Sequence, residues 1–108
     1  MATAAKPRNR KAPVRAQLSV DYPRQGETVT GPYYAIRVNA PEEAESVQVA
    51  VDLGEWRPCR PSAGFWWCDW SGYESGEHAI AARLVTLAGK TFSSVPHGFF
   101  VQLEKRPA

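Results

Sequence analysis

Residues 64–70 read GFWWCDW, and their side chains alternate between two faces with the period of a β-strand. Two rings and a thiol share the face that suits a core: Trp66, Cys68 and Trp70. Two rings and a carboxylate share the opposite face: Phe65, Trp67 and Asp69. Residues 55–59, EWRPC, read as the other arm of a hairpin that turns in RPSAG. The stretch therefore predicts a hairpin with one buried face and one outward aromatic face.

The flanking sequence repeats this alternation in short segments separated by Gly- and Pro-containing turns. Residues 33–40, 46–53 and 78–86 each place apolar side chains at every second position. The predicted inward residues are Tyr34, Ile36, Val38, Ala40, Val47, Val49, Val51, His78, Ile80, Ala82 and Leu84. Residues 91–103 contain Pro96 and Gly98, which predicts two short strands or one strand with a bulge. With no helical period anywhere, the chain is predicted to be an all-β sandwich of about seven antiparallel strands.

Composition limits the size and class of the protein. The 108 residues are 44% hydrophobic and 22% charged, which is ordinary for one folded domain. The length excludes a TIM barrel or a nucleotide-binding domain joined to a substrate domain. No apolar run approaches the roughly 18 residues of a membrane-spanning helix, so no membrane span is expected.

The net charge of +2 conceals a strong asymmetry along the chain. Residues 16–103 hold six basic and ten acidic side chains, whereas residues 1–15 hold no acid and five bases: Lys6, Arg8, Arg10, Lys11 and Arg15. We therefore expect a disordered basic tail at 1–17, a sandwich at 18–103 and a C-terminal tail at 104–108. The tail suits weak electrostatic contact with an acidic partner, but the acidic body disfavours nucleic acid as a ligand.

The N-terminal residues also bear on location. They lack the apolar stretch of a secretory signal, which favours the cytoplasm. A pair of cysteines instead favours an oxidising compartment, so the location stays open.

Cys59 and Cys68 lie on opposite arms of the predicted hairpin. A two-residue loop at Ala63 and Gly64 places them opposite each other at a non-hydrogen-bonded pair, where a disulfide can form. A three-residue loop shifts the register and places Cys59 opposite Trp67 instead. Both a disulfide and two free core thiols are therefore open. Neither cysteine belongs to a C-x-x-C motif, and no metal or cofactor is expected.

Several segments together resemble bacterial immunoglobulin-like domains of the E-set type. They are YPRQGETVTGPYYAIRVNA (22–40), VQVAVDLGEW (47–56), GFWWCDW (64–70) and SGEHAIAARLVTLAGK (75–90). Trp66 and Trp70 before GEHAIAAR are also similar to the immunoglobulin-like dimerisation domain of sulfite-oxidase relatives. The resemblance covers about residues 18–102 and implies an immunoglobulin-like sandwich that serves as a scaffold or interaction module. Val85, Thr86 and Leu87 stand where many relatives carry an acid, so calcium binding is not implied.

The tryptophans carry the functional prediction. Trp56, Trp66 and Trp70 are expected in the core, whereas Trp67 is expected on the outer face with Phe65 and near Tyr33. An outward pair of large rings suits contact with another protein or with a second copy of the chain. A carbohydrate stacked on these exposed aromatics is the alternative. Cover of the two rings by the basic tail, or by the Arg57 and Arg60 stems, is the explanation without a binding role.

No constellation for catalysis is visible. His78 is expected to be a hydrogen-bonded structural residue, and His97 is expected in an exposed loop. The motifs of nucleophilic hydrolases, zinc proteases and P-loop enzymes are absent from the sequence. The sequence therefore predicts a non-catalytic immunoglobulin-like protein-interaction module that can self-associate.

Overall fold

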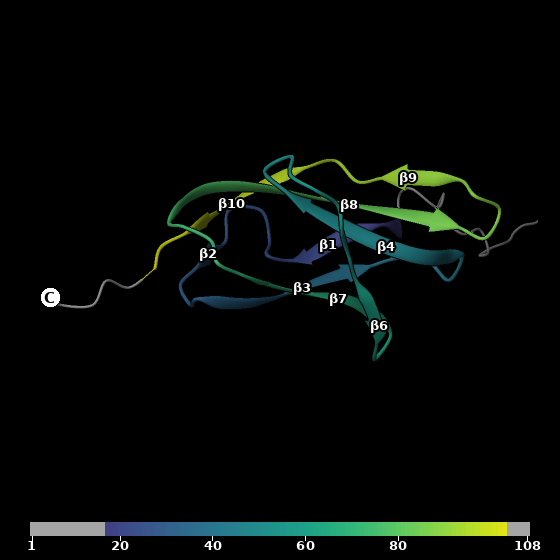
Figure 1. Cartoon of the computed structure of the whole chain (residues 1–108), viewed down its shortest axis with the longest axis horizontal. Helices are drawn as coiled ribbons and strands as arrows, with labels where there is room; N and C mark the ends of the chain where they lie inside the picture. The colour runs from purple at the N-terminus through teal and green to yellow at the C-terminus, as the bar shows by residue number, and fades with distance from the viewer. Residues whose placement is uncertain (1–16, 104–108) are drawn as a thin grey trace, which may run out of the picture.

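The computed structural model describes residues 17–103, and every regular element within this range is a β-strand (Figure 1). The strands are β1 (Ser19–Tyr22), β2 (Thr28–Val29), β3 (Tyr33–Asn39), β4 (Ala44–Val51), β5 (Arg57–Pro58), β6 (Arg60–Ser62), β7 (Phe65–Ser71), β8 (Gly76–Thr86), β9 (Thr91–Ser93) and β10 (His97–Val101). The predicted basic tail and the predicted C-terminal tail lie outside the described residues, apart from Gln17. Among residues 17–103 there is no helix that could cross a membrane.

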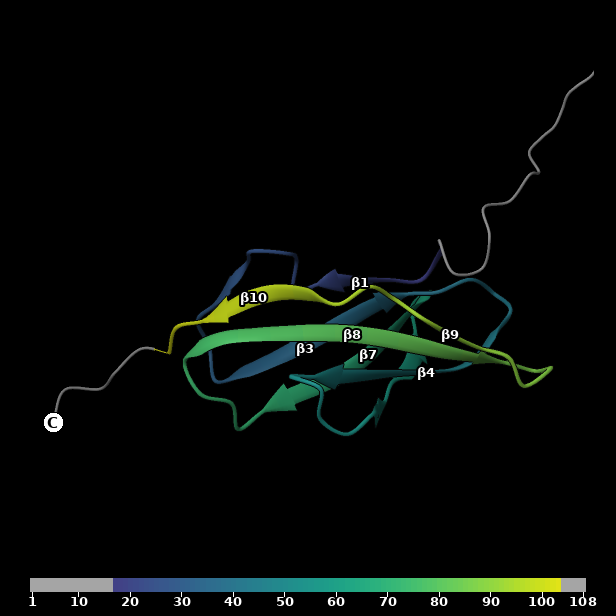
Figure 2. The same ribbon diagram turned by 90° about the horizontal axis from the view of Figure 1, so that it is seen from above.

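The strands form two packed sheets, as Figures 1 and 2 show. One sheet has the order β1-β3-β7-β6, and the other has the order β2-β10-β8-β4-β5 with β9 also paired to β8. All pairings are antiparallel within the described chain except that of β10 with the two-residue β2. The prediction of an all-β sandwich is confirmed, and the short strands raise the number of elements to ten.

The core lies between the inner faces of the sheets, where the alternating pattern placed it. Ile36 and Val38 of β3 and Val47 and Val49 of β4 are almost completely buried. The core cluster comprises Leu18, Val29, Ile36, Val38, Val47, Val49, Cys68, Trp70, Ile80, Ala82, Leu84, Phe99 and Val101. Trp66, Tyr34 and Val51 pack against this cluster in half-buried positions. Period-two patterning decides the faces because successive side chains on a strand point to opposite sides.

The segment after β8 splits into two strands around Pro96. β9 ends at Ser93 and β10 begins at His97, which confirms the prediction of two short pieces. The prediction of an exposed loop at His97 is wrong, because this residue begins β10 and its Nε2 lies 2.8 Å from the Pro23 carbonyl oxygen. The fold brings Pro23 to His97 from 74 residues away, which local turn signals could not indicate.

The hairpin between β6 and β7 has the two-residue loop. Ser62 pairs with Phe65 and Arg60 pairs with Trp67, and the loop residues Ala63 and Gly64 both have positive φ, 54° and 83°. These angles are those of a type I′ turn, whose twist matches that of the flanking strands. Of the two registers left open by the sequence, the structure therefore has the one that leads to Cys59 opposite Cys68.

Replacing Ala63 by asparagine is expected to stabilise the fold by about 0.5–1 kcal/mol. Alanine at positive φ carries a steric cost from its Cβ, whereas asparagine adopts this conformation readily and favours type I′ turns. Ala63 is exposed, so the new side chain meets no packing constraint. Urea unfolding of the two proteins measures the difference. A destabilised Ala63→Asn variant would contradict the turn assignment.

Candidate functional site

The predicted aromatic face lies on the outer side of the four-stranded sheet. Phe65 and Trp67 are both half-buried there, with ring centroids 6.3 Å apart in an edge-to-face arrangement. The Trp67 Nε1 donates a hydrogen bond to the Ser62 carbonyl oxygen at 2.9 Å. This bond uses the one polar group of the indole ring, so it fixes the Trp67 ring against the β6–β7 hairpin.

Arginine side chains cover part of this aromatic face. The Arg37 guanidinium lies 4.0 Å from the centre of the Phe65 ring and 4.8 Å from that of Tyr22. Asp21 holds Arg37 in place through a 3.1 Å ion pair. The expected cover by arginine therefore exists at Phe65, but it comes from β3 rather than from Arg57 or Arg60. The outer face around Phe65 is therefore less apolar than the sequence predicts, because the charged Arg37 side chain lies on it.

Tyr33 lies on the same outer face but apart from the other two rings. It pairs with Ser71, whereas Trp67 pairs with Arg37, four residues farther along β3. Four residues of strand correspond to roughly 13 Å. Tyr33 is 79% exposed. The structure thus brings Phe65 and Trp67 together and leaves Tyr33 separate; the binding role of all three stays a prediction.

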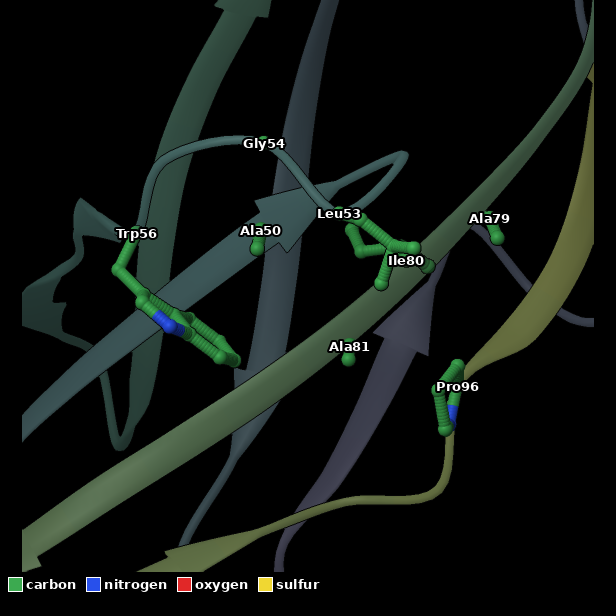
Figure 3. Close-up of a pocket in the computed structure, with 8 residues that line it drawn as sticks. All are labelled: Ala50, Leu53, Gly54, Trp56, Ala79, Ile80, Ala81 and Pro96. Atoms are coloured by element: carbon green, nitrogen blue, oxygen red, sulfur yellow. The ribbon is translucent and has the colours of Figure 1, made fainter.

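A groove that the sequence did not reveal lies on the outer face of the six-stranded sheet (Figure 3). Its volume is about 150 Å³, and its lining is mainly apolar. The lining residues, here called the alanine groove, are Ala50, Leu53, Gly54, Trp56, Ala79, Ile80, Ala81 and Pro96. An apolar cavity of this volume can hold a benzene-sized group.

Small side chains on paired strands make the floor of the alanine groove. Ala50 of β4 and Ala81 of β8 are direct partners across the sheet, and Ala79 follows on the same face of β8. Outward positions on a sheet are ordinarily polar, so three alanines there leave a depression without a polar cover. The signal that the sequence offered is alanine at three positions that alternation assigns to the outer face: Ala50, Ala79 and Ala81.

Trp56 forms one wall of the groove, and the prediction that it belongs to the core is wrong. It is half-buried outside the core cluster, with the Arg83 guanidinium 4.4 Å from its ring centre. Gln48 accepts a hydrogen bond from Arg83 and so fixes the cation over the ring. Figure 3 shows the Trp56 ring lying toward β8, with Pro96 at the other end of the groove. Trp56 follows a turn rather than a strand, so no alternation assigned its face.

Leu53 overhangs the groove from a tight turn and is 95% exposed. Asp52 and Leu53 have φ of 56° and 61°, and the Gly54 N–H donates to the Val51 carbonyl oxygen at 2.9 Å. A leucine in the left-handed region is sterically costly, and an exposed one gains nothing from burial. Residues held in this region cluster at binding and switch sites, which makes Leu53 a candidate contact residue.

The carboxylate of Asp52 holds this turn to β8. One oxygen accepts the Ala79 N–H at 2.9 Å, and the other lies 2.6 Å from the Nδ1 of His78. The second ring nitrogen of His78 lies 2.8 Å from the Glu74 carbonyl oxygen. Both ring nitrogens therefore face acceptors, an arrangement that only the protonated imidazolium can satisfy fully.

The environment of His78 shifts its pKa upward. Burial of the ring acts to lower the pKa, but the hydrogen bonds to the Glu74 carbonyl and the Asp52 carboxylate outweigh burial and raise it. The expectation of a hydrogen-bonded structural histidine agrees with this geometry. His78 also stacks on Phe99 and meets the edge of Trp70, so the turn that carries Leu53 is linked to the core.

Solved structures of low sequence identity share this sandwich. The fibronectin(III)-like modules of Clostridium thermocellum CbhA match with a TM-score of 0.65 and 17% identity, over 78% of this chain and 93% of that chain. CopC from Methylosinus trichosporium OB3b matches with a TM-score of 0.60 and 13% identity, over 84% and 97%. An engineered protein matches with a TM-score of 0.65 and 23% identity over 80% of this chain, which spans only 20% of that protein.

No protein-family model and no curated protein sequence matches the chain. At these identities the structural likenesses concern the fold alone. They confirm an immunoglobulin-like β-sandwich, whereas the finer resemblance to E-set domains and to sulfite-oxidase relatives stays a prediction. The chain therefore has the fold of a small immunoglobulin-like β-sandwich, shared with these fibronectin(III)-like modules and CopC.

Proposed function

We propose that the chain is a non-catalytic protein-interaction module that self-associates through the alanine groove. The observation that carries this proposal is the position of a protruding side chain beside a hollow of matching size. Leu53 is almost fully exposed at the rim, and the groove next to it has a volume of about 150 Å³, the size of one aliphatic side chain. Val95, beside the Pro96 wall, is also exposed.

A two-fold dimer requires that the same patch supply both halves of each contact. The alanine groove satisfies this requirement, since Leu53 of one copy can enter the groove of the other and the reverse contact follows by symmetry. Burial of the leucine and of the Trp56 wall removes apolar surface from water on both copies. A sugar ligand would need several hydrogen-bonding groups around the ring, and the lining offers mainly carbon atoms.

Replacing Leu53 by aspartate is expected to weaken self-association about 100-fold or more. Each dimer loses two buried leucines, each worth about 1.5–3 kcal/mol, and gains two carboxylates in an apolar site. Light scattering over a range of protein concentrations measures the dimer mass. Leu87→Asp is the matched control, because Leu87 is 83% exposed but lies outside the groove lining.

Complementation separates this geometry from a general loss of solubility. Ala81→Arg should fill the groove while leaving Leu53 intact, so this variant alone should also be monomeric. A mixture of Leu53→Asp and Ala81→Arg restores one of the two contacts and should give a heterodimer. A wild-type protein that stays monomeric at all concentrations would overturn self-association. Quenching of tryptophan fluorescence by glycans, lost in Trp67→Ala, would instead support the carbohydrate alternative.

A further inference from the structure

Cys59 and Cys68 face each other at the base of the β6–β7 hairpin. Arg60 pairs with Trp67, and continuing this register by one residue beyond β6 places Cys59 opposite Cys68. This pair falls at a non-hydrogen-bonded position, where facing side chains come closest. Both cysteines are free thiols in the structure, each thiol is the largest electrostatic influence on the other, and the Cys68 thiol donates to the Asp69 carbonyl oxygen at 3.7 Å.

Cys59 also connects the two sheets. Its backbone N–H donates a hydrogen bond to the Val47 carbonyl oxygen of β4 at 2.8 Å, while its side chain meets Cys68 of β7 in the other sheet. The chain crosses from one sheet to the other at this residue, between β5 and β6. A bond between the sulfur atoms would therefore tie the crossing strand covalently to the core of the sandwich.

The electrostatic surroundings favour one thiolate within the pair. The neighbouring Cys59 thiol, with smaller contributions from the Arg57 and Arg60 guanidiniums, lowers the pKa of Cys68 to about 7 against the opposing effects of burial and of the Asp69 carboxylate. The neighbouring Cys68 thiol, together with burial, raises the pKa of Cys59. The surroundings therefore favour the thiolate form at Cys68 and the thiol form at Cys59. A thiolate next to a second thiol is the arrangement that thiol–disulfide exchange requires.

We propose that Cys59 and Cys68 form a redox site that exchanges with small-molecule disulfides and closes into an intramolecular disulfide. Cys59, the half-exposed member, passes its proton to the neighbouring Cys68 thiolate as its sulfur attacks the small disulfide. A mixed disulfide forms, and the first small thiolate leaves and takes the proton from Cys68. The Cys68 thiolate then attacks the Cys59 sulfur, and the second small thiolate leaves and takes a proton from water. The protein is oxidised to the disulfide, and the small disulfide is reduced to two thiols.

The test equilibrates the full chain with mixtures of oxidised and reduced glutathione. After an acid quench, iodoacetamide alkylates the remaining thiols and the intact mass is measured. We expect the oxidised species to have lost two hydrogen atoms and to carry neither glutathione nor alkyl groups, with a fraction that falls as reduced glutathione increases. Wild-type protein that is doubly alkylated at every ratio, or that keeps a stable glutathione adduct, would overturn the proposal.

Single variants test the order of attack. Cys68→Ser keeps the half-exposed Cys59 and should accumulate a glutathione adduct that wild type resolves. Cys59→Ser keeps only the buried Cys68 and should form the adduct much more slowly. Faster adduct formation in Cys59→Ser than in Cys68→Ser would contradict the assigned order.

The melting temperature gives a readout that needs no variant. The disulfide closes a loop of about ten residues, which should raise the melting temperature of oxidised wild type by roughly 10 °C over the reduced protein. An oxidised form that melts no higher than the reduced form would show that the bond does not constrain the folded hairpin, against the proposal.

Discussion

Replacing Trp70 by alanine is expected to lower the free energy of unfolding by about 3–5 kcal/mol, which is a large part of the stability of a small domain. Trp70 is only 5% exposed and stacks on Tyr73 with ring centroids 3.9 Å apart. It also makes edge-to-face contacts with Phe99 and His78, with ring centroids 5.5 and 5.6 Å apart. Alanine would leave a cavity between the sheets that these side chains cannot fill without moving.

Urea unfolding followed by tryptophan fluorescence or circular dichroism measures this loss. Trp67→Ala is the matched control, because Trp67 lies on the same strand but on the outer face. It should lose partial burial and one hydrogen bond to Ser62, which together cost less, about 1–2 kcal/mol. Equal destabilisation by the two substitutions would contradict the assignment of inner and outer faces on β7.

Replacing Asp52 by alanine is the second large effect, with an expected loss of about 2 kcal/mol at slightly acidic pH. The substitution removes the acceptor for the Ala79 N–H and the carboxylate partner of His78. It also frees the turn that carries Leu53. The Asp52 side chain is 49% exposed, so water replaces part of what is lost and the effect is smaller than for a buried pair.

The pH dependence of this effect follows from the raised pKa of His78. A histidine whose pKa is higher in the folded than in the unfolded state contributes stability fully below the unfolded value. This contribution is lost as the pH rises through the folded value. The difference in stability between wild type and Asp52→Ala should therefore be largest below the unfolded pKa of histidine, 6.5, and shrink as the pH rises through the raised folded pKa of His78.

Urea unfolding at a series of pH values checks this expectation. Asp52→Asn is a useful companion variant, because its amide oxygen can still accept the Ala79 N–H while the negative charge is gone. This variant should recover part of the stability at all pH values without restoring the pH dependence. A difference between wild type and Asp52→Ala that is constant with pH would show that His78 does not carry the interaction.

The inner faces of the long strands β3 and β8 were predictable, because each of these strands has one buried face and one outer face. In β3 and β8 every second residue is apolar, and the structure buries Ile36, Val38, Ile80 and Leu84 as the pattern indicates. The face of Trp56 was not predictable, since it lies in the irregular segment between β4 and β5, where period two does not apply. The separation of Tyr33 from Trp67 depended on the β3–β7 register, which neither strand specifies alone.

The sequence by itself determined the class of the fold, the inner faces of the long strands and a hairpin in which Cys59 and Cys68 can meet. Local alternation is enough for these, because backbone geometry sends neighbouring side chains to opposite sides of a strand. Only the tertiary structure decided that Ala50, Ala79 and Ala81 form one groove floor, and that Leu53 and Pro96 overhang it. It also decided that Asp52 holds His78 across 26 residues. These arrangements depend on strand order and loop direction, which arise from the packing of the whole chain.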